Sequence, residues 1–238
     1  MNNPQIYASQ GDSFVYKSDL RLLQHGNWLN DNLISFYLEC LTSKFNVSNL
    51  RVIDSAVVSF LVNQLDEEEE DFQSECSSMD IFESGNSNFL IPVNSSYASS
   101  ETFGEVGAGN HWSLLHIVIM EAQVSWKHYD SSPSLSNSSA ASRTLSKFML
   151  CYKTARKISI GNAVGEDIAG NQTDGWRCGW YVLGNCSRIL QGQEGGEDGE
   201  GLAQVREEME RFLKERRTLT EREIMTKRRL ERFEGVSK

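Results

Sequence analysis

The sequence lacks the features that would indicate a metal centre, a disulfide framework or a membrane segment. Its five cysteines are scattered and odd in number, without a CxxC pair or the Cys and His spacing of a zinc site, so we expect reduced thiols. No apolar run approaches the roughly 18 residues of a membrane span, and the N-terminus has no signal-peptide pattern. These absences predict an intracellular protein, in the cytoplasm or the nucleus.

Positive charge is also scarce. The chain has 23 Lys and Arg against 33 Asp and Glu, a formal net charge of −10, which disfavours nucleic acid or an anionic membrane as a partner and favours a partner with a basic tail. With 238 residues, 39% of them hydrophobic, the chain is long enough for one domain with a sizeable core. Nothing argues for a second domain, so we expect a single domain over residues 1–238.

Two helices are predicted in the first third of the chain. Residues 30–45 carry apolar side chains at helical spacing, and Asn30 is a suitable N-cap for them. Residues 54–64 are a second, shorter helical candidate. The acidic, serine-rich stretch over residues 65–87 is predicted to be an exposed loop.

Strands dominate the middle of the chain. A short apolar run covers residues 88–94, and two longer runs rich in β-branched and aromatic residues, 111–121 and 123–131, are separated by little more than a turn. The two longer runs should form an antiparallel hairpin. A helix near residues 139–152 and a strand over 155–163 should follow.

The last part of the chain is predicted to be helical. One helix begins at Cys178, and a Gly- and Glu-rich linker covers residues 191–201. Two charged amphipathic helices should follow, over 202–216 and 219–233.

The turn TDGWR runs directly into the apolar helix that begins at Cys178. In the first turn of a helix, unpaired backbone N–H groups and the helix dipole favour a negatively charged sulfur. The thiolate is the nucleophilic form of cysteine, so this is a position where an enzyme would place a catalytic cysteine. The alternative interpretation is a small buried apolar residue, which is how a free cysteine usually behaves.

A nucleophilic cysteine needs a base, and the base needs a group that orients it. His111 stands at the start of one predicted hairpin strand, and Asp130 stands at the end of the other. With a turn centred near Met120 and Glu121, these two residues lie directly opposite each other, with Cβ atoms ~5 Å apart. This is the distance that an aspartate needs to orient an imidazole.

The other three histidines have no such partner in this register. His116 would face Ser125, and His128 would face Ser113, so neither has a carboxylate opposite it. His25 lies beside a loop glycine. Solvated or structural roles are therefore expected for all three.

Gln172 lies on the same loop as the cysteine, six residues before Cys178. Its side-chain amide could join the backbone N–H of Cys178 in holding the oxyanion that forms when a carbonyl is attacked. The alternative is an ordinary surface glutamine.

Four motifs, taken together, resemble the ubiquitin-like-protein-specific cysteine proteases, the Ulp and sentrin-specific protease family. NWLND, HWSLL, HYDSS and QTDGWRCGWY occur in the order and with roughly the spacing of that family, and the resemblance covers about residues 10–235. The short stretch before NWLND and the sequence ending in GAGNHWSLL look most like the short deneddylase branch, which acts on the Nedd-type ubiquitin-like modifier.

The resemblance implies an α+β, papain-like (adenain-type) cysteine protease fold, with a mainly antiparallel central sheet flanked by helices and the nucleophile at a helix N-terminus. It implies Cys178 as nucleophile, His111 as general base and acid, Asp130 as the orienting carboxylate and Gln172 as oxyanion donor. Neither a metal nor a cofactor is needed. The expected partner is a ubiquitin-like modifier with its conjugates or precursor, and the chain is expected to be a monomer.

The resemblance also implies a narrow lid, formed by Trp28 and Trp112, over the C-terminal Gly-Gly of the substrate, with Asn30 and Asp31 in the same substrate-binding set. Two indoles that close on an extended strand leave room for backbone but not for side chains, so only glycines pass. Without the family, Trp28 would be interpreted as core packing beside Leu29, and Trp112 as a surface aromatic.

The sequence departs from the family at the nucleophile. The family usually has aspartate immediately before the cysteine, where this chain has Arg177, and Asp174 stands where asparagine is common. Arg177 could favour the thiolate electrostatically. It could also disturb the loop.

The expected reaction is hydrolysis after Gly-Gly through a thioester at Cys178. A SUMO-specific protease is the alternative within the family. An acyltransferase of the bacterial effector type would need a basic inositol phosphate pocket, for which the chain offers only KRRLER near its end. A modifier-binding pseudoprotease is the alternative that is not an enzyme; the presence of all four expected catalytic residues counts against it, whereas Arg177 keeps it open.

Overall fold

The computed structural model describes residues 5–66, 68–82, 85–98, 111–121, 123–196 and 199–218. The helix predicted over residues 219–233 lies outside the described residues. No helix in the described part of the chain is long and apolar enough to cross a membrane.

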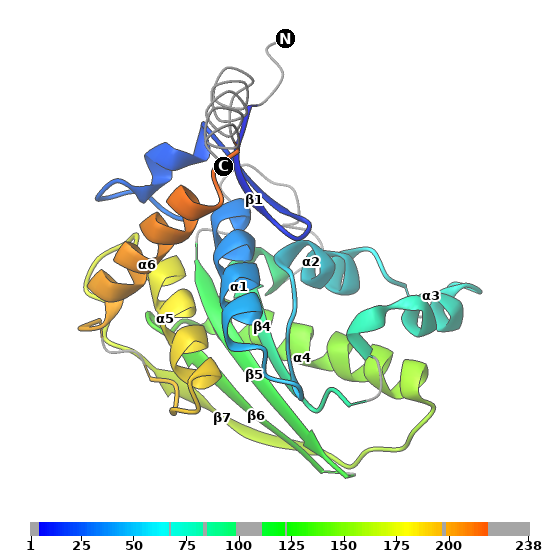
Figure 1. Cartoon of the computed structure of the whole chain (residues 1–238). Helices are drawn as coiled ribbons and strands as arrows, with labels where there is room; N and C mark the ends of the chain where they lie inside the picture. Colours follow the sequence, from blue (N-terminus) through cyan, green and yellow to red (C-terminus); the bar gives the residue numbers. More distant parts are fainter. Residues whose placement is uncertain are drawn as a thin grey trace, which may run out of the picture.

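A five-stranded sheet lies between two groups of helices (Figure 1). Its strands, in spatial order, are β3 (Leu50–Val52), β4 (Asn88–Asn94), β5 (Trp112–Met120), β6 (Gln123–Asp130) and β7 (Ala163–Ala169). The central strands β4, β5 and β6 are antiparallel, as predicted, whereas β3 and β7 run parallel to their neighbours at the two edges. A separate hairpin of β1 (Ile6–Gln10) and β2 (Ser13–Tyr16) precedes the 3-10 turn η1 (Asp19–Leu23).

Both faces of the sheet are covered by helices (Figure 1). One apolar cluster joins the sheet to α1 (Asp31–Phe45), α5 (Cys178–Leu190) and α6 (Leu202–Glu215), and the other joins it to α2 (Ser55–Asn63), α3 (Phe72–Ser78) and α4 (Leu135–Arg156). Successive side chains of β4 point to opposite faces of the sheet, so Leu90 packs with the first cluster while Phe89 and Ile91 pack with the second.

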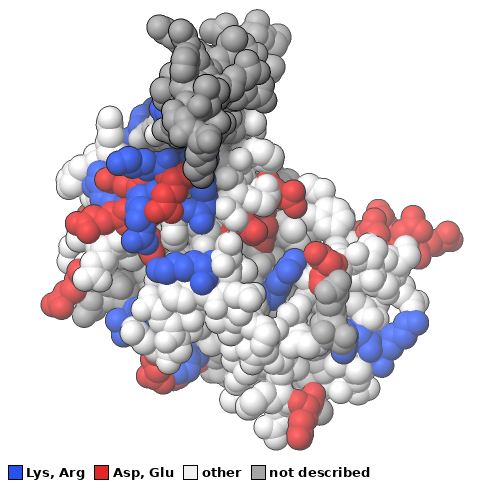
Figure 2. Space-filling model, in the orientation of Figure 1, with Lys and Arg blue, Asp and Glu red and all other residues white. Residues whose placement is uncertain are grey.

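The helix predicted at residue 30 is confirmed. The Asn30 side chain accepts a hydrogen bond from the backbone N–H of Leu33 (3.1 Å), which is the capping contact that the sequence indicated. Helix α6 also lies where it was predicted, and its Lys, Arg and Glu side chains intermingle on the surface (Figure 2). Several of them pair within the helix, as Arg211 does with Glu208 at 2.9 Å.

The prediction of an exposed loop over residues 65–87 was wrong. This stretch contains α3 and the 3-10 turn η2 (Asp80–Phe82), and five of its side chains are buried in the core: Leu65, Phe72, Cys76, Ile81 and Phe82. The acidic and serine residues around them dominate the composition and hide this spaced set of apolar positions. The described acidic residues before α3 are exposed.

The strand predicted over residues 155–163 was also wrong. Helix α4 continues to Arg156, and the edge strand begins only at Ala163. The helix also starts earlier than predicted because the Ser134 side chain accepts a hydrogen bond from the backbone N–H of Asn137 (3.2 Å) and caps it.

Candidate active site

Cys178 is the first residue of α5 and is 2% exposed. The preceding turn is built around Asp174, whose carboxylate accepts hydrogen bonds from the backbone N–H groups of Trp176 (3.0 Å) and Arg177 (2.9 Å). The same carboxylate forms an ion pair with the Arg177 guanidinium. Arg177 is therefore part of an ordered turn, and its charge is paired with Asp174. The sequence alone had left open whether Arg177 would disturb this loop.

His111 lies between Cys178 and Asp130. Its Nε2 atom is 2.7 Å from Oδ1 of Asp130, and Cys178 is close enough to the imidazole to raise its pKa. Since an ionised carboxylate can only accept, Nε2 carries the proton in the neutral ring and Nδ1 keeps its lone pair for the thiol. The structure thus brings together the three residues that the sequence placed in one site.

The charges of this group support one another. Burial disfavours the charged form of His111, but the hydrogen bond with Asp130 and the nearby Cys178 outweigh it and raise the pKa of His111 to about 9. Burial would likewise raise the pKa of Asp130, yet the hydrogen bonds from His111 and Asn137 hold it below its usual range. His111 is therefore mostly protonated near neutral pH in the resting site.

The predicted hairpin register was wrong by two residues. Met120 pairs with Gln123, so the turn is centred one position later than expected, and Leu115, not Ser113, lies opposite His128. The side chains of His111 and Asp130 meet diagonally across β5 and β6. Diagonal neighbours are within reach of long side chains, which is why the expected contact forms in spite of the shift.

Asn137 is a site residue that sequence reasoning missed. Its Nδ2 atom donates to Oδ2 of Asp130 (2.9 Å) and to the backbone carbonyl of Ser132 (3.0 Å), and it is 4% exposed. The Ser132 N–H donates to Oδ1 of Asp130 (3.0 Å), so three donors hold the carboxylate. The signal that could have found Asn137 is the Ser134 cap, which places an amide in the first turn of α4, directly after the strand that ends at Asp130.

Gln172 is held inside the nucleophile loop. Ser131 donates a hydrogen bond to its Oε1 atom (2.7 Å), and its Nε2 atom donates to the backbone carbonyl of Asp174 (2.6 Å). The same Nε2 atom also lies 3.4 Å from Oδ1 of Asp174, so an oxyanion would compete with Asp174 for this amide. Its role towards an oxyanion stays a prediction.

Trp28 and Trp112 line one groove. The alternative interpretations, core packing for Trp28 and a surface aromatic for Trp112, do not describe them. Trp28 is 49% exposed and so is not a core residue, whereas Trp112 is 8% exposed and so is not a surface aromatic. The Trp28 indole N–H donates to the carbonyl of Gly175 in the nucleophile loop, and that of Trp112 donates to the carbonyl of Leu29 (3.2 Å). Both indoles are thus fixed relative to Cys178.

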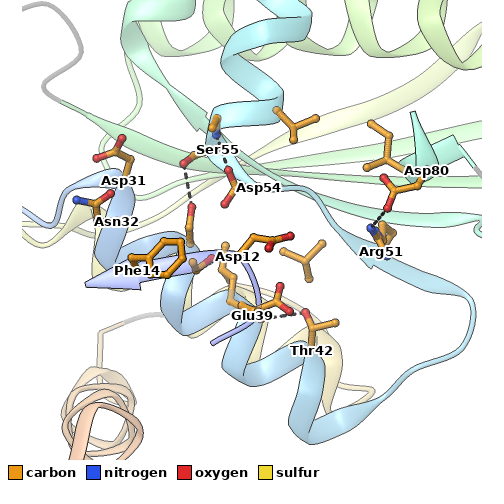
Figure 3. Close-up of a pocket in the computed structure, with 18 of the residues that line it drawn as sticks. Asp12, Phe14, Asp31, Asn32, Glu39, Thr42, Arg51, Asp54, Ser55 and Asp80 are labelled. Atoms are coloured by element: carbon orange, nitrogen blue, oxygen red, sulfur yellow. Dashed lines mark hydrogen bonds and ion pairs between the residues drawn. The ribbon is translucent and has the colours of Figure 1, made fainter. Parts of the chain in front are cut away.

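The groove that the two tryptophans line has a volume of about 990 Å³ and extends over the start of α1, including Asn30 and Asp31. A second hollow of about 590 Å³ shares Asp31 with it and lies between β2, α1 and the start of α2 (Figure 3). Glu39 lies in this second hollow, where burial raises its pKa, Arg51 opposes the shift, and Asp12 and Asp54 add to it. The acidic side chains of the lining outnumber Arg51: Asp12, Asp31, Glu39, Asp54 and Asp80. The surface beyond the groove therefore favours cationic groups.

The other histidines have different environments. His116 contacts Oδ1 of Asn88 (2.6 Å), and burial lowers its pKa to about 4. His25 packs on the ring of Trp176, with ring centroids 4.8 Å apart. His128 has a carboxylate partner after all, Asp167 (2.7 Å), which the hairpin could not reveal because it comes from β7.

The remaining four cysteines, Cys40, Cys76, Cys151 and Cys186, are buried, and burial raises the pKa of each thiol. Cys178 is the cysteine that begins α5 beside His111. Among the described residues, no group of His, Cys, Asp and Glu is arranged to hold a metal ion.

Comparison with known proteins decides the family. No family model matches the chain. A Dictyostelium discoideum protein named "Probable sentrin-specific protease 8" is 30% identical over 200 residues, which cover 80% of this chain and 77% of that protein. The chain belongs to the sentrin-specific protease family. The family expected from the four motifs is thus confirmed, and with it the class of enzyme, a cysteine peptidase.

Two further matches agree with this assignment. Sentrin-specific protease 8 of Rattus norvegicus is 28% identical over 197 residues, covering 78% of this chain and 80% of that protein. The C-terminal Ulp1 protease domain, solved in complex with Smt3, the yeast ortholog of SUMO, superposes with a TM-score of 0.62 at 16% identity and covers 90% of this chain and 88% of that domain. The second match confirms the expected papain-like fold.

Proposed function

We propose that this protein cleaves after the C-terminal Gly-Gly of a ubiquitin-like modifier, and that the modifier is of the Nedd type. The observation that carries the proposal is the 2.7 Å contact between Asp130 and His111, with Cys178 beside that imidazole at the start of a helix. This arrangement provides a nucleophile, a base and an orienting carboxylate in contact with one another. A pseudoprotease would not need to retain it.

The first half of the reaction forms a thioester. The Cys178 sulfur attacks the carbonyl carbon of the last glycine, and the electron pair of the carbonyl moves to its oxygen. The backbone N–H of Cys178 and the Gln172 amide, once it leaves its longer 3.4 Å contact with Oδ1 of Asp174, stabilise that oxyanion. As the carbonyl re-forms, the carbon–nitrogen bond breaks, and the His111 imidazolium donates its Nδ1 proton to the leaving amine.

The second half hydrolyses the thioester. Water attacks the thioester carbonyl, and neutral His111 takes up a proton from it at Nδ1. The carbon–sulfur bond then breaks, which releases the modifier with a free Gly-Gly carboxylate and returns Cys178. Asp130 holds the imidazole in the tautomer that both steps require.

The groove supports glycine selectivity. The Trp28 indole is fixed by the Gly175 carbonyl of the nucleophile loop and the Trp112 indole by the Leu29 carbonyl, so the space between their rings has a defined width. An extended Gly-Gly presents only backbone there, whereas any Cβ would meet an indole face. Asn30 and Asp31 line the same groove and would contact the modifier beyond its tail.

The choice of modifier rests on the relatives and on charge. The relatives are named sentrin-specific protease 8 or probable sentrin-specific protease 8, which agrees with the resemblance of the motifs to the deneddylase branch. The acidic residues beside the groove, with Glu39 among them, favour a modifier with an arginine before Gly-Gly, which the Nedd-type modifier has and SUMO lacks. Ubiquitin shares that arginine, so its exclusion requires a contact elsewhere, worth about 3 to 4 kcal/mol for a few hundred-fold preference.

A panel of Nedd-type, SUMO and ubiquitin probes with a C-terminal electrophile tests the proposal. We expect covalent capture of Cys178 by the Nedd-type probe much faster than by the SUMO probe, and faster than by the ubiquitin probe. Cys178→Ala is the matched control and should capture none of them. Faster reaction with the SUMO probe would overturn the modifier assignment, and no capture by any probe would overturn the activity.

A further inference from the structure

A second histidine–carboxylate pair lies beside the catalytic one. The imidazole of His128 is fully buried, with Nδ1 2.7 Å from Oδ1 of Asp167 and Nε2 2.9 Å from Oγ of Ser113. Ser113 is 2% exposed, so its hydroxyl cannot reach a substrate, whereas the Asp167 side chain is about half exposed. The chemistry proposed above uses none of these three groups, although they connect three neighbouring strands.

This series of bonds repeats the geometry of the catalytic pair. Because side chains alternate along a strand, Ser113 lies on the same face of β5 as His111, and His128 lies on the same face of β6 as Asp130. In each pair, the residue from β6 does not lie directly opposite its partner but is displaced from it by two positions of the register. The bond between Ser113 and His128 thus lies two residues further along both strands, towards the hairpin turn, than the bond between His111 and Asp130.

The catalytic pair is anchored from opposite sides. The backbone carbonyl of His111 accepts from the N–H of Ser95 (3.0 Å), which directly follows β4. The carbonyl of Asp130 accepts from the N–H of Gly170 (2.7 Å), which directly follows β7. The two catalytic side chains therefore belong to strand ends that are held by different neighbours, and their separation depends on the seam between β5 and β6.

The regular pairing across that seam ends at Leu114 and Tyr129, before the strands reach the catalytic pair. The structure assigns His128 as a positioning residue for the reaction: held by Asp167, it ties β6 to β5 through Ser113 and so keeps the orienting carboxylate on the catalytic imidazole. This assignment rests on the proposed roles of that carboxylate and imidazole.

The hydrogen-bonding capacities fit this role. The Asp167 carboxylate only accepts, so it fixes the proton of neutral His128 on Nδ1, and Nε2 then accepts from the Ser113 hydroxyl. Each buried polar atom of the bridge then has one partner. Because an unpaired buried group costs about 1–3 kcal/mol, the bridge resists any sliding of one strand along the other.

Two amide substitutions separate the two bonds of the bridge. The shorter amide in His128→Asn can take the place of Nδ1 and keep Asp167, but it loses Ser113, whereas the longer amide in His128→Gln can reach Ser113. We expect kcat to fall roughly 10- to 100-fold in His128→Asn and in Ser113→Ala, with KM changed less than about threefold. His128→Gln and Ser113→Thr, which keep the link across the seam, should retain more activity.

His116→Gln is the matched control. Like Ser113, His116 is in β5 and makes one side-chain bond to a neighbouring strand, in its case with Asn88 of β4. It lies away from the end of the β5–β6 pairing where the catalytic pair is. We expect its kcat to stay within about twofold of the wild-type value, because it cannot move the catalytic pair. An equal loss in His116→Gln and Ser113→Ala would mean that any weakening of the sheet lowers kcat, and would overturn the assignment.

The rate at which iodoacetamide alkylates Cys178, with the site located by mass spectrometry, depends on the His111 imidazole beside the thiol. This rate can be measured in the absence of a modifier substrate. We expect Ser113→Ala and His128→Asn to slow it, and Ser113→Thr to restore it. If folded variants, judged by circular dichroism and thermal melting, react and cleave like wild type, His128 is only structural. If His128→Asn does not fold, Ser113→Ala decides. Rapid wild-type alkylation without cleavage of any modifier would instead reject the proposed function.

Discussion

Asp130→Asn is the change that tests the catalytic pair most directly, because it alters one atom at the centre of the hydrogen-bond network. The carboxylate accepts from His111 and Ser132 at Oδ1 and from Asn137 at Oδ2. An asparagine has only one acceptor oxygen. Whichever way its amide turns, its NH₂ group must face either the NH₂ of Asn137 or Nε2 of His111.

The second orientation is the damaging one for catalysis. An NH₂ group that faces Nε2 makes that nitrogen the acceptor and puts the imidazole proton on Nδ1, where the base needs a lone pair. Losses of an orienting carboxylate of this kind lower kcat by up to about 10⁴-fold, and we expect roughly 10²- to 10⁴-fold for Asp130→Asn, about 3–5 kcal/mol of barrier. Asn137→Ala removes one donor and keeps the carboxylate, so it should cost roughly 10-fold at most.

The pH dependence supplies a second readout. The pKa of His111 is raised to about 9, so its contribution to the free energy of unfolding is present below its ordinary pKa and is lost as the pH rises through about 9. The pKa of Asp130 is held low, so its contribution is present above the ordinary range of a carboxyl and is lost in acid. The stability difference between wild type and Asp130→Asn should therefore be largest between those limits.

The assay is cleavage of a modifier fused to a fluorogenic amine, measured from pH 5 to 10. In wild type, kcat should fall as the pH rises through about 9, when His111 loses the proton that it gives to the leaving amine. In Asp130→Asn this limb should move to lower pH, and thermal melting at each pH should follow the stability window. Near-normal turnover in a folded Asp130→Asn protein would refute the orienting role.

The remaining predictions concern the nucleophile and the groove. Cys178→Ala should abolish cleavage and preserve modifier binding by calorimetry; residual cleavage would mean a different nucleophile. Trp28→Ala should relax the preference for Gly-Gly over Ala-Gly tails with little effect on thermal unfolding, whereas the buried Trp112→Ala should do so and also cost about 3 kcal/mol or more of stability. Asp31→Asn should raise KM a few-fold, an effect that shrinks with added salt; a salt-independent change would argue against a charge contact.

The sequence predicted contacts better than it predicted geometry. His111 and Asp130 were identified because a hairpin brings its two ends together under any nearby register, and a two-residue slip still leaves long side chains in reach. Helix α3 was missed because an acidic run dominated the local composition, while its apolar side chains are buried only by packing on α4 and the sheet. Asp167 was unpredictable as a partner of His128 because the edge strand itself was placed too early.

The nucleophile turn shows how a change at one position can be compensated nearby. Arg177 occupies the position before the cysteine, and without Asp174 the partly buried turn there would hold an unpaired guanidinium and unsatisfied backbone donors. Asp174 satisfies both groups, because its Oδ1 atom accepts from the two backbone N–H groups of the turn and its Oδ2 atom pairs with the Arg177 guanidinium. The same turn supplies the Gly175 carbonyl that holds the Trp28 indole. One carboxylate therefore fixes the approach to Cys178 and, through the backbone, the position of the lid, so the departure at residue 177 is compatible with the rest of the site.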